Sequence, residues 1–559
     1  MTEPAPTQST PTQSAPPESV PTQSVPTQSV PTQSAPTQST LAERDRRRGR
    51  SVRGIELPSH KTASTQHPLA PAPLPTTIIL PLEAGLSARD LRPAVETGQR
   101  VLRGQPLVQG GGPLATWTHA STSGVVRLLQ RRRIAHPRRR EALCAVIEVD
   151  GRDEPYAEAA KRPDPTQWDT PDKVGVALSR AGLEGLGGAV FPTGLKLAAA
   201  GRHRMRLVIV NGVECEPYIS CDDMLMRTSP RDVLAGALAL VELTGAPRGV
   251  VAVEEDKPEA LKALQRALPS LGDTQQRLTI ETVPTMYPAG GERQLIQALT
   301  GDEVPSLAKP TDIGYLCQNV GTVAALYRYF ASGEPVTSRI TTVTGSAIAT
   351  PRNLDVRLGT PIADLVAACG GYTGKVARLV MGGSMMGVAL EDDDIPVGRA
   401  ANCIVAASAE ELREDAEVAC IRCGNCSNVC PAYLLPQELN AAAKHDEFDL
   451  LETFGLFDCI ECGCCDVVCP SHIPLAETFR VAKRRLVQAM APTARVRWLD
   501  AREQLRRQRV ESWDREHNGQ AGAEPPPLRT RLEAVVEIVE RASRLPAVTV
   551  TSKGEGGNA

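Results

Sequence analysis

The sequence comprises 559 residues, with 62 Lys and Arg against 65 Asp and Glu, so its formal net charge is −3. A chain this long is expected to form about three to five domains, and without an excess of cations it is not expected to bind nucleic acid. No stretch of about 18 uninterrupted apolar residues predicts a membrane-spanning helix, no apolar signal core opens the chain, and the 15 cysteines therefore indicate metal binding in a reducing cytosol.

Residues 1–49 form a Pro-rich leader that repeats the motif PTQS with a period of five. A proline at every fifth residue forbids helix and sheet alike, so we expect this leader to be disordered and solvated. It can act as a tether or partner-binding arm, or only as a spacer. The spacer is the favoured interpretation, because the repeat carries no aromatic or apolar cluster.

Residues 50–155 predict a small β barrel or sandwich domain. The segments TTIILPL, QRVLRGQPLVQG and TSGVVRLLQ are short apolar strands separated by Gly and Pro turns. Two runs of three arginines follow, at 131–133 and 138–140. Such runs are more often a solvated face than a binding site, although an anionic lipid surface or an acidic partner is the alternative.

Residues 165–333 predict a parallel α/β domain, because the order strand, loop, helix recurs three times. A buried strand is predicted at 206–210, Pro258 opens a helix after an acidic loop, and a third helix is predicted over Glu292 to Leu299. Ligands of such sheets bind at the carboxyl ends of the strands, where these loops fall.

Two loops of this domain have chemical potential. In GLGGAVFPTGLKL, three glycines would let backbone N–H groups approach a nucleotide, with Lys196 as a phosphate counter-charge, although a packed glycine turn explains the pattern about equally well. In NGVECEP, Glu214 and Glu216 follow the strand, where carboxylates suit ribose hydroxyls or a nicotinamide amide. The alternative for these two is a solvated loop end.

Residues 335–407 predict a β-grasp domain without a catalytic group. Two strands are followed by a helix at 361–369 and another strand, with Thr360 as N-cap and Pro361 as the first helical residue. The whole chain is therefore predicted to be a multidomain protein of α/β and α+β class.

Nine of the 15 cysteines lie between Cys420 and Cys469, and eight of them form two copies of C-x2-C-x2-C-x3-C-P. In this spacing three cysteines wrap one cubane, and the fourth, before a proline, ligates the other. Zinc is the alternative, but it prefers cysteine pairs with longer spacers. The predicted ligands of the two [4Fe-4S] clusters are Cys420, Cys423, Cys426 and Cys469 for one, and Cys430, Cys459, Cys462 and Cys465 for the other.

The ninth cysteine, Cys464, is expected to be a bystander. The segment between the motifs has a helical pattern beginning at Pro436, which predicts a helical ferredoxin domain over 410–490, followed by a basic helical or disordered tail over 491–559. Two cubanes pass electrons singly, whereas a nicotinamide supplies a pair, so a flavin is expected to connect them.

The sequence resembles the C subunit of the Rnf electron-transport complex, a membrane-bound ferredoxin:NAD oxidoreductase, over roughly residues 50–490. The resemblance lies in VLRGQPL, GLGGAVFPTGLKL, VNGVECEPYISCDDMLM, YPAGGERQLIQALTG, GGSMMGVAL and both cysteine motifs. The middle region is also similar to the flavin-bearing, NADH-oxidising subunit of respiratory complex I. This similarity implies an FMN and NADH site made of Gly185, Gly187, Gly188, Phe191, Thr193, Gly194, Lys196, Asn211, Glu214, Glu216, Tyr287, Gly290, Glu292, Asn319 and Thr322.

The resemblance implies a peripheral subunit on the cytoplasmic side of the cell inner membrane that moves electrons between NAD(H) and the complex. Its implied partners are integral membrane subunits and a ferredoxin-like iron-sulfur subunit. Val213, Gly291 and Leu197 depart from the complex I pattern. Two rivals follow: an iron-sulfur adaptor without a functional nucleotide site, and an oxidoreductase of thiols or organic acids, for which no substrate motif is found.

Overall fold

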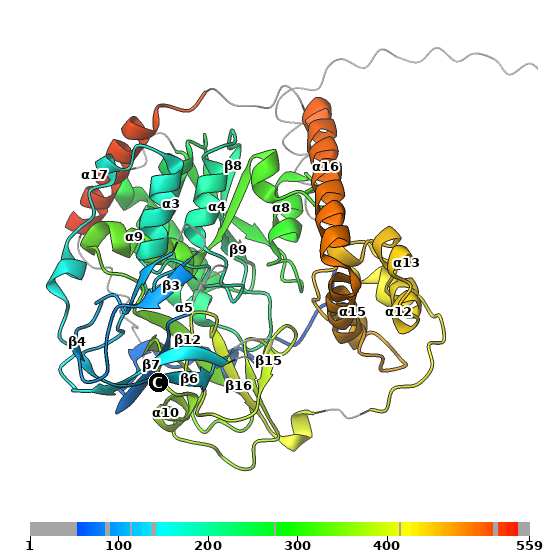
Figure 1. Cartoon of the computed structure of the whole chain (residues 1–559), viewed down its shortest axis with the longest axis horizontal. Helices are drawn as coiled ribbons and strands as arrows, with labels where there is room; N and C mark the ends of the chain where they lie inside the picture. Colours follow the sequence, from blue (N-terminus) through cyan, green and yellow to red (C-terminus); the bar gives the residue numbers. More distant parts are fainter. Residues whose placement is uncertain are drawn as a thin grey trace, which may run out of the picture. The chain divides into compact units, whose positions relative to one another are not determined.

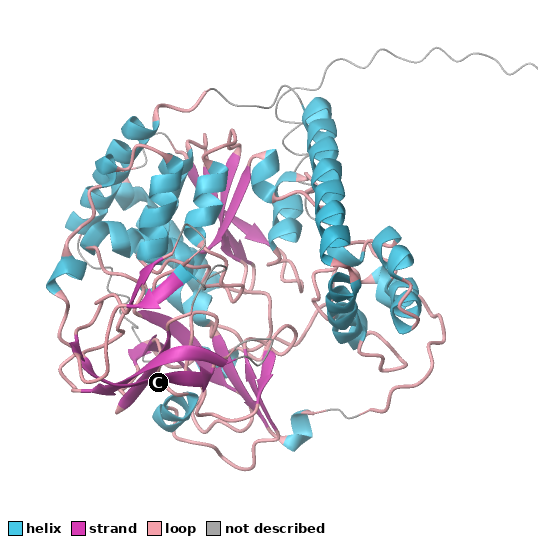
Figure 2. Cartoon of the chain, in the orientation of Figure 1, coloured by secondary structure: helices cyan, strands magenta, loops and turns pink. Residues whose placement is uncertain are grey.

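The computed structural model of the chain describes residues 53–83, 90–111, 115–135, 141–272, 276–412, 415–517 and 524–545 (Figure 1). The predicted leader and the second arginine run lie outside these residues. Helices and strands are distributed along the described chain as Figure 2 shows. Among the described helices, none combines the length and the apolar character needed to cross a bilayer.

An antiparallel β domain comes first. Its four-stranded sheet has the order β2-β7-β6-β4, and a separate pair joins β3 to β5. The strands are β2 Thr77–Pro81, β3 Leu91–Pro93, β4 Arg100–Val101, β5 Val108–Gly110, β6 Gly124–Arg133 and β7 Glu141–Val149. The first arginine run ends β6, where Arg133 forms ion pairs with Glu391 at 2.7 Å and Asp392 at 3.3 Å. This run is therefore an exposed, ion-paired strand end.

The segment that precedes β2 pairs with other parts of the chain, which the sequence did not predict. Ile55 forms an antiparallel bridge with Tyr287. The short helix α2 (Thr62–Thr65) follows, and β1 (Ala70–Pro71) lies parallel to β13 (Arg352–Arg357). Residues before the small β domain thus connect the α/β domain to the β-grasp sheet.

The predicted parallel sheet is confirmed, with the order β10-β9-β8-β11 and parallel pairing throughout. Its strands are β8 Leu207–Gly212, β9 Gly249–Glu254, β10 Leu278–Val283 and β11 Tyr315–Asn319. The sequence does not predict β11, because YLCQN is too short and too polar to indicate a buried strand.

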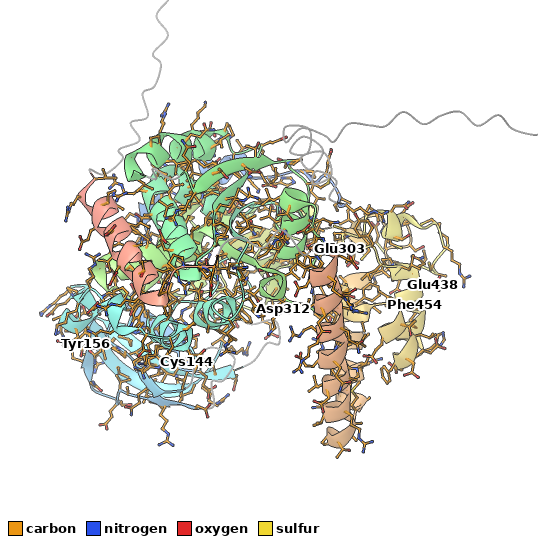
Figure 3. All side chains as sticks on the ribbon, turned by 90° about the horizontal axis from the view of Figure 1, so that it is seen from above. Cys144, Tyr156, Glu303, Asp312, Glu438 and Phe454 are labelled. Atoms are coloured by element: carbon orange, nitrogen blue, oxygen red, sulfur yellow. The ribbon has the colours of Figure 1, made fainter. Side chains whose placement is uncertain are left out.

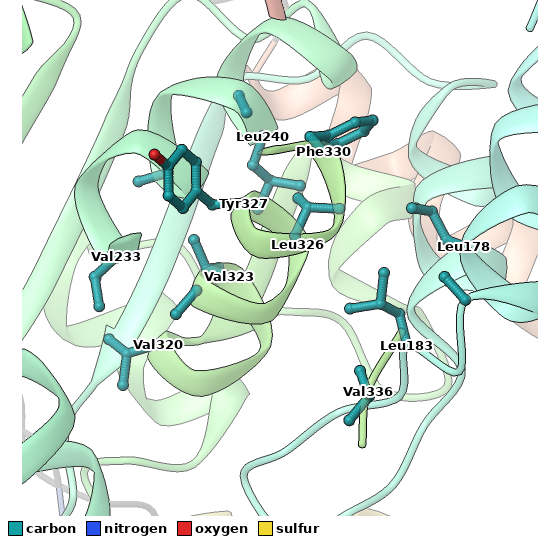
Figure 4. Close-up of a cluster of buried hydrophobic side chains, with 14 of the residues drawn as sticks. Leu178, Leu183, Val233, Leu240, Val320, Val323, Leu326, Tyr327, Phe330 and Val336 are labelled. Atoms are coloured by element: carbon teal, nitrogen blue, oxygen red, sulfur yellow. The ribbon is translucent and has the colours of Figure 1, made fainter. Parts of the chain in front are cut away.

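Helices cover both faces of this sheet. They are α3 Pro171–Arg180, α4 Thr193–Ala200, α5 Cys221–Thr228, α6 Pro230–Thr244, α7 Pro258–Ala267, α8 Glu292–Thr300 and α9 Val320–Ser332. Successive strand residues point to opposite faces: Val208 joins the core formed with α6 and α9, whereas Ile209 joins the core formed with α8. Figure 4 shows part of the first core, with Val323 and Leu326 of α9 beside Leu240 of α6.

The β-grasp region is a six-stranded mixed sheet with the order β1-β13-β12-β16-β14-β15. Its further elements are β12 Ser338–Thr344, β14 Arg378–Met381, β15 Val388–Leu390, β16 Cys403–Ala407 and helix α10 Ile362–Ala368. The predicted cap is wrong by one residue. Pro361 is extended (ψ 143°) and is the N-cap, and the Thr360 hydroxyl donates to the Arg357 carbonyl at 2.8 Å instead of capping the helix.

The described residues from 415 to 490 form helices and no strands, as predicted. The helices are α11 Asn425–Asn428, α12 Pro436–Lys444, α13 Phe448–Thr453, α14 Cys464–Val467 and α15 Leu475–Ala489. They share a small core that includes Leu439, Leu451 and Phe479.

Short 3-10 turns occur at Ala157–Ala160, Pro165–Gln167, Leu268–Leu271, Pro310–Ile313, Ala409–Glu411 and Leu456–Asp458.

The described part of the tail is helical, one of the two predicted alternatives, and it is packed, which the sequence did not predict. It forms α16 (Pro492–His517) and α17 (Leu528–Arg544). The apolar side of α17 is inaccessible to solvent at Leu532 and Val535 and belongs to the core of α6 and α9. Arg531 also donates to the Leu243 carbonyl at 2.8 Å, at the end of α6.

Leu532→Ala is expected to lower the free energy of unfolding of the α/β domain by about 2–5 kcal/mol, because it removes a buried side chain and leaves a cavity. Calorimetric or urea unfolding measures this loss. The matched control is Glu533→Ala, one residue along on the exposed side, with an expected change within about 0.5 kcal/mol. Equal effects of the two substitutions would contradict the packing of α17.

Candidate functional site

Four separate segments converge at the carboxyl ends of the parallel strands. Asn211 at the end of β8 and Asn319 at the end of β11 are register partners on neighbouring strands. The Asn211 amide donates to the Gly290 carbonyl at 2.9 Å, which brings in the third predicted segment. The backbone N–H of Leu186, in the glycine-rich loop, donates to the Thr322 hydroxyl at 2.9 Å. The structure therefore brings the predicted segments together at one edge of the sheet.

Lys196 and Glu292, both predicted cofactor residues, pair with each other. The Lys196 ammonium lies 2.5 Å from a Glu292 carboxylate oxygen and also donates to the Cys317 carbonyl at 2.7 Å. Both side chains are partly exposed, at 21% and 36%. The pair holds the start of α4 against the start of α8, and its charged groups still reach solvent.

The glycines of the site differ in the structural reason that each position requires glycine. A Cβ at Gly194 would clash with the Gly175 carbonyl, and one at Gly290 would clash with the Val213 carbonyl, so backbone packing requires both. Gly188 has φ +97°, a region that favours glycine. At Gly185 the nearest atom to such a Cβ is 3.4 Å away, an ordinary contact.

Gly187 is also free of backbone crowding. A Cβ there would lie 3.2 Å from the Asn319 side chain and meet no backbone atom among its nearest neighbours. Packing within the described chain thus gives no strong reason for glycine at Gly185, whereas at Gly187 an added Cβ would press on the Asn319 side chain, which would have to shift slightly. The lack of a side chain at both positions suits the close approach of a ligand to the backbone.

Glu214 is used by the fold itself. Its carboxylate accepts the backbone N–H groups of Asp222 (2.8 Å) and Asp223 (3.3 Å) at the start of α5, and Lys61 donates to its carbonyl. Burial raises the pKa of Glu214 to about 8; Lys61 opposes this shift and Asp222 adds to it. The carboxylate is therefore a positioning group for α5 rather than an open acceptor.

Glu216 is also engaged, across a domain boundary. One carboxylate oxygen accepts the backbone N–H groups of Met385 (2.8 Å) and Met386 (2.7 Å), in the loop between β14 and β15. Burial raises the pKa of Glu216, and these two hydrogen bonds act in the opposite direction. The sequence suggested that Glu216 binds a nucleotide. Apart from its glycines, nothing in GGSMMG indicated that this loop would contact Glu216.

Two other predicted residues have different surroundings. Phe191 is 42% exposed. Thr193, which begins α4, is almost fully buried, and its hydroxyl has no hydrogen-bond partner within the described chain. A buried hydroxyl without a partner is costly, so Thr193 is available to a ligand of this loop.

A buried ion pair behind the glycine-rich loop escaped the sequence analysis. Glu184, just before Gly185, lies 3.5 Å from Arg399 of the β-grasp region, and Arg399 donates to the Trp117 carbonyl at 2.7 Å. Burial, and secondarily Arg399, lowers the pKa of neighbouring His119 to about 3, so this imidazole is neutral at physiological pH. The pair fixes the glycine-rich loop against the β-grasp region and, through Trp117, against the first β domain. No local sequence motif predicts such a long-range contact.

The cysteine motifs enclose two small cavities. The junction cavity is lined by Cys430, Cys459, Cys462 and Cys465, with Cys464 beside them. The outer cavity is lined by Cys420, Cys423, Cys426 and Cys469. These are the two crossed sets predicted from the spacing: each cavity receives three sulfurs from one motif and the fourth from the other.

The two motifs adopt the same local turn. Arg422 and Gly424 have positive φ in the first motif, as Glu461 and Gly463 have in the second. In both, the N–H of the residue two after the first cysteine points to its sulfur at 3.4 Å. Four convergent sulfurs on a repeated turn fit a cubane, whose irons bind cysteine thiolates.

Tyr287 links the two sites. It opens the third predicted cofactor segment, and its hydroxyl donates to the Cys462 carbonyl at 2.7 Å. The Cys464 thiol lies 3.9 Å from the Tyr287 carbonyl, and both side chains belong to one buried cluster with Cys462. Cys464 therefore packs at the junction between the sheet domain and the junction cavity. Figure 3 shows the side chains of the helical domain, with Glu438 and Phe454 labelled.

Family models match four parts of the chain. They are described as "RnfC Barrel sandwich hybrid domain" (residues 50–152), "Nuo51 FMN-binding domain" (178–328), "SLBB domain" (340–389) and "4Fe-4S dicluster domain" (418–489). The FMN-binding match includes all four converging segments, and the dicluster match includes both cysteine motifs.

Several relatives are named as the C subunit of an ion-translocating oxidoreductase complex. The chain is 45% identical to the one from Pseudomonas aeruginosa over 431 residues (77% of this chain, 55% of the relative). It is 41% identical to that of Erwinia tasmaniensis over 459 residues (82% and 56%), and 40% identical to one from Vibrio cholerae over 408 residues (72% and 52%). The chain thus spans about half the length of the relatives it matches.

Among solved structures, the chain is similar to an NAD+-reducing [NiFe]-hydrogenase in the air-oxidised state. The sequence identity is 18% and the TM-score 0.41, over 70% of each chain. A TM-score of this size does not establish a shared fold.

Gly187→Ala is expected to weaken FMN binding about 10- to 100-fold, because the added methyl group occupies space beside Asn319, an overpacking cost of about 1–3 kcal/mol. Flavin titration of the apoprotein measures the change. Two substitutions serve as controls. Gly374→Ala, where nothing lies within 4 Å, should leave affinity and stability unchanged, whereas Gly194→Ala should destabilise the fold. Unchanged flavin affinity in Gly187→Ala would contradict the assignment.

Proposed function

We propose that the chain is the peripheral electron-carrying subunit of an ion-translocating oxidoreductase complex, since it is 40–45% identical to relatives named as the C subunit of such a complex. It exchanges electrons between NAD(H) and the rest of the complex through FMN and two [4Fe-4S] clusters. Its proposed place is the cytoplasmic side of the cell inner membrane, and its proposed partners are integral membrane subunits and a ferredoxin-like iron-sulfur subunit.

The observation that carries this proposal is the hydrogen bond from Tyr287 to the Cys462 carbonyl. Tyr287 belongs to the segment that leads into α8, and Cys462 is one of four cysteines around the junction cavity. Side chains of one buried cluster span the two sites. A nucleotide site and a metal site in direct contact suit electron exchange, which an isolated binding domain would not need.

FMN, when bound, supplies the exchange between the electron pair of a nicotinamide and the single electrons of the clusters. The chain would hold it with residues whose present contacts leave room for a ligand. Gly185 and Gly187 keep the loop open to close approach, and Thr193 offers a buried hydroxyl without a partner. The Lys196 and Glu292 pair presents charge at the rim, where Lys196 can meet a phosphate.

Both carboxylates of the NGVECEP loop would act indirectly. Glu214 fixes the start of α5, whose Asp222 in turn accepts from the Asn319 amide at 2.6 Å. Glu216 fixes the GGSMMG loop beside Gly463 of the second cysteine motif. These contacts orient the edge of the site and leave its interior to the glycine-rich loop.

The eight crossed cysteines would ligate iron as thiolates, four in each cavity. Cys464 lies on the wall of the junction cavity, and its adjacent Cys465 keeps the spacing of the motif. The chain therefore supplies eight ligands and one additional buried thiol at the junction.

An adaptor without nucleotide binding is the second candidate. It is favoured by the internal engagement of Glu214, Glu216 and Lys196, each of which already binds a group of the chain. In that function the clusters would relay electrons between protein partners only.

An anaerobic NADH titration of the reconstituted protein separates the two functions. Flavin absorbance and the electron paramagnetic resonance of the clusters are followed together. We expect NADH to bleach the flavin and reduce the clusters. A protein whose clusters are reduced by dithionite but not by NADH, and which holds no flavin, would support the adaptor and contradict the proposal.

A further inference from the structure

The two cysteine cavities have different walls. Apart from its cysteines, the junction cavity is lined mainly by apolar groups such as Leu434, Ile460 and Phe479. The outer cavity also has apolar lining residues, such as Ile473 and Leu475, but adds two side-chain amides, Gln437 and Asn440. No side-chain amide is among the described residues that line the junction cavity.

Both amides come from one face of α12. They are three residues apart in a helix and therefore neighbours on its surface. The Gln437 amide oxygen lies 3.4 Å from the Cys426 sulfur. Asn440 is only 4% exposed, and its amide oxygen is buried without a hydrogen-bond partner in the described part of the chain. An iron-bound sulfur cannot donate to this oxygen, so Asn440 can meet a sulfur in the cavity only with its NH2 group, after a half turn of the amide.

The contact of Gln437 changes when its neighbour is a metal ligand. In the present contact the Cys426 thiol donates to the amide oxygen. A thiolate bound to iron has no proton to donate and can only accept. A half turn of the amide then presents its NH2 group, because the two ends of an amide have nearly the same shape.

Hydrogen bonds to the sulfurs and exposure to solvent both control the reduction potential of such clusters. A donor stabilises the form with more negative charge, which is the reduced one. Exposure acts in the same direction: two of the four outer cysteines, Cys420 and Cys423, are exposed and one is buried, whereas three of the four around the junction cavity are buried and none is exposed.

We propose that Gln437 and Asn440 donate amide hydrogen bonds to sulfur atoms in the outer cavity and give its cluster a more positive reduction potential than that of the junction cavity. This inference rests on the proposed function, since it presupposes both clusters. Under it, α12 makes the two repeated motifs unequal, and electrons that enter beside Tyr287 are held preferentially at the outer position.

The experiment is a potentiometric titration of the full chain, followed by electron paramagnetic resonance, for wild type, Gln437→Met and Asn440→Leu. Each substitution keeps side-chain size and removes the donor. At a fixed potential, we expect the ratio of reduced to oxidised outer cluster to fall about three- to tenfold per variant, the worth of one net hydrogen bond. A soluble paramagnetic lanthanide chelate identifies the outer cluster, because it broadens the more exposed signal.

The matched control is Ala441→Gln, which adds an amide on the exposed side of the same helix and should change neither cluster. Iron content is measured first for every protein. A shift confined to the exposed cluster supports the inference. With full iron content, unchanged potentials or equal shifts of both clusters overturn it, as does loss of iron from both variants, which would assign the amides a structural role. A wild type without iron would instead refute the proposed function.

Discussion

Each cysteine motif completes the other. Three sulfurs of each motif line one cavity, and the fourth, four residues beyond the third and just before a proline, lines its neighbour. Neither cavity has four sulfurs unless both motifs are in place, so the helices between and around them must pack as one unit. The core that includes Leu439, Leu451 and Phe479 holds these helices together. The same positive φ angles at Arg422 and Glu461 show that one local turn is used twice.

The second constraint is the contact between this unit and the sheet domain. Tyr287 touches the second motif with both its hydroxyl and its carbonyl. Glu216 ties the GGSMMG loop to the same region, and Met385 of that loop lies within 3.5 Å of where a Cβ of Gly463 would sit. Three domains therefore meet at one edge of the junction cavity. The Glu216 carboxylate, which the sequence suggests for a nucleotide ligand, holds this meeting point through the Met385 and Met386 backbone.

Local signals carried the successful predictions. Pro258 and Pro436 begin helices because proline suits the first helical turn. The cysteine spacing predicts two crossed ligand sets, and the residues of each set line one cavity. Long-range contacts could not be predicted. Nothing near Glu216 in the sequence names Met385 as its partner, and the basic composition of the tail conceals the apolar stripe by which Leu532 docks on α6 and α9. The predicted N-cap at Thr360 was wrong because its hydroxyl donates to the Arg357 carbonyl, at the end of β13, and not to the helix.

The central claim, that the crossed cysteines hold two cubanes, is tested most directly by metal and acid-labile sulfide analysis of the anaerobically purified protein. The account predicts about eight irons and about eight sulfides per chain. About two zinc ions per chain, with no labile sulfide, would contradict it.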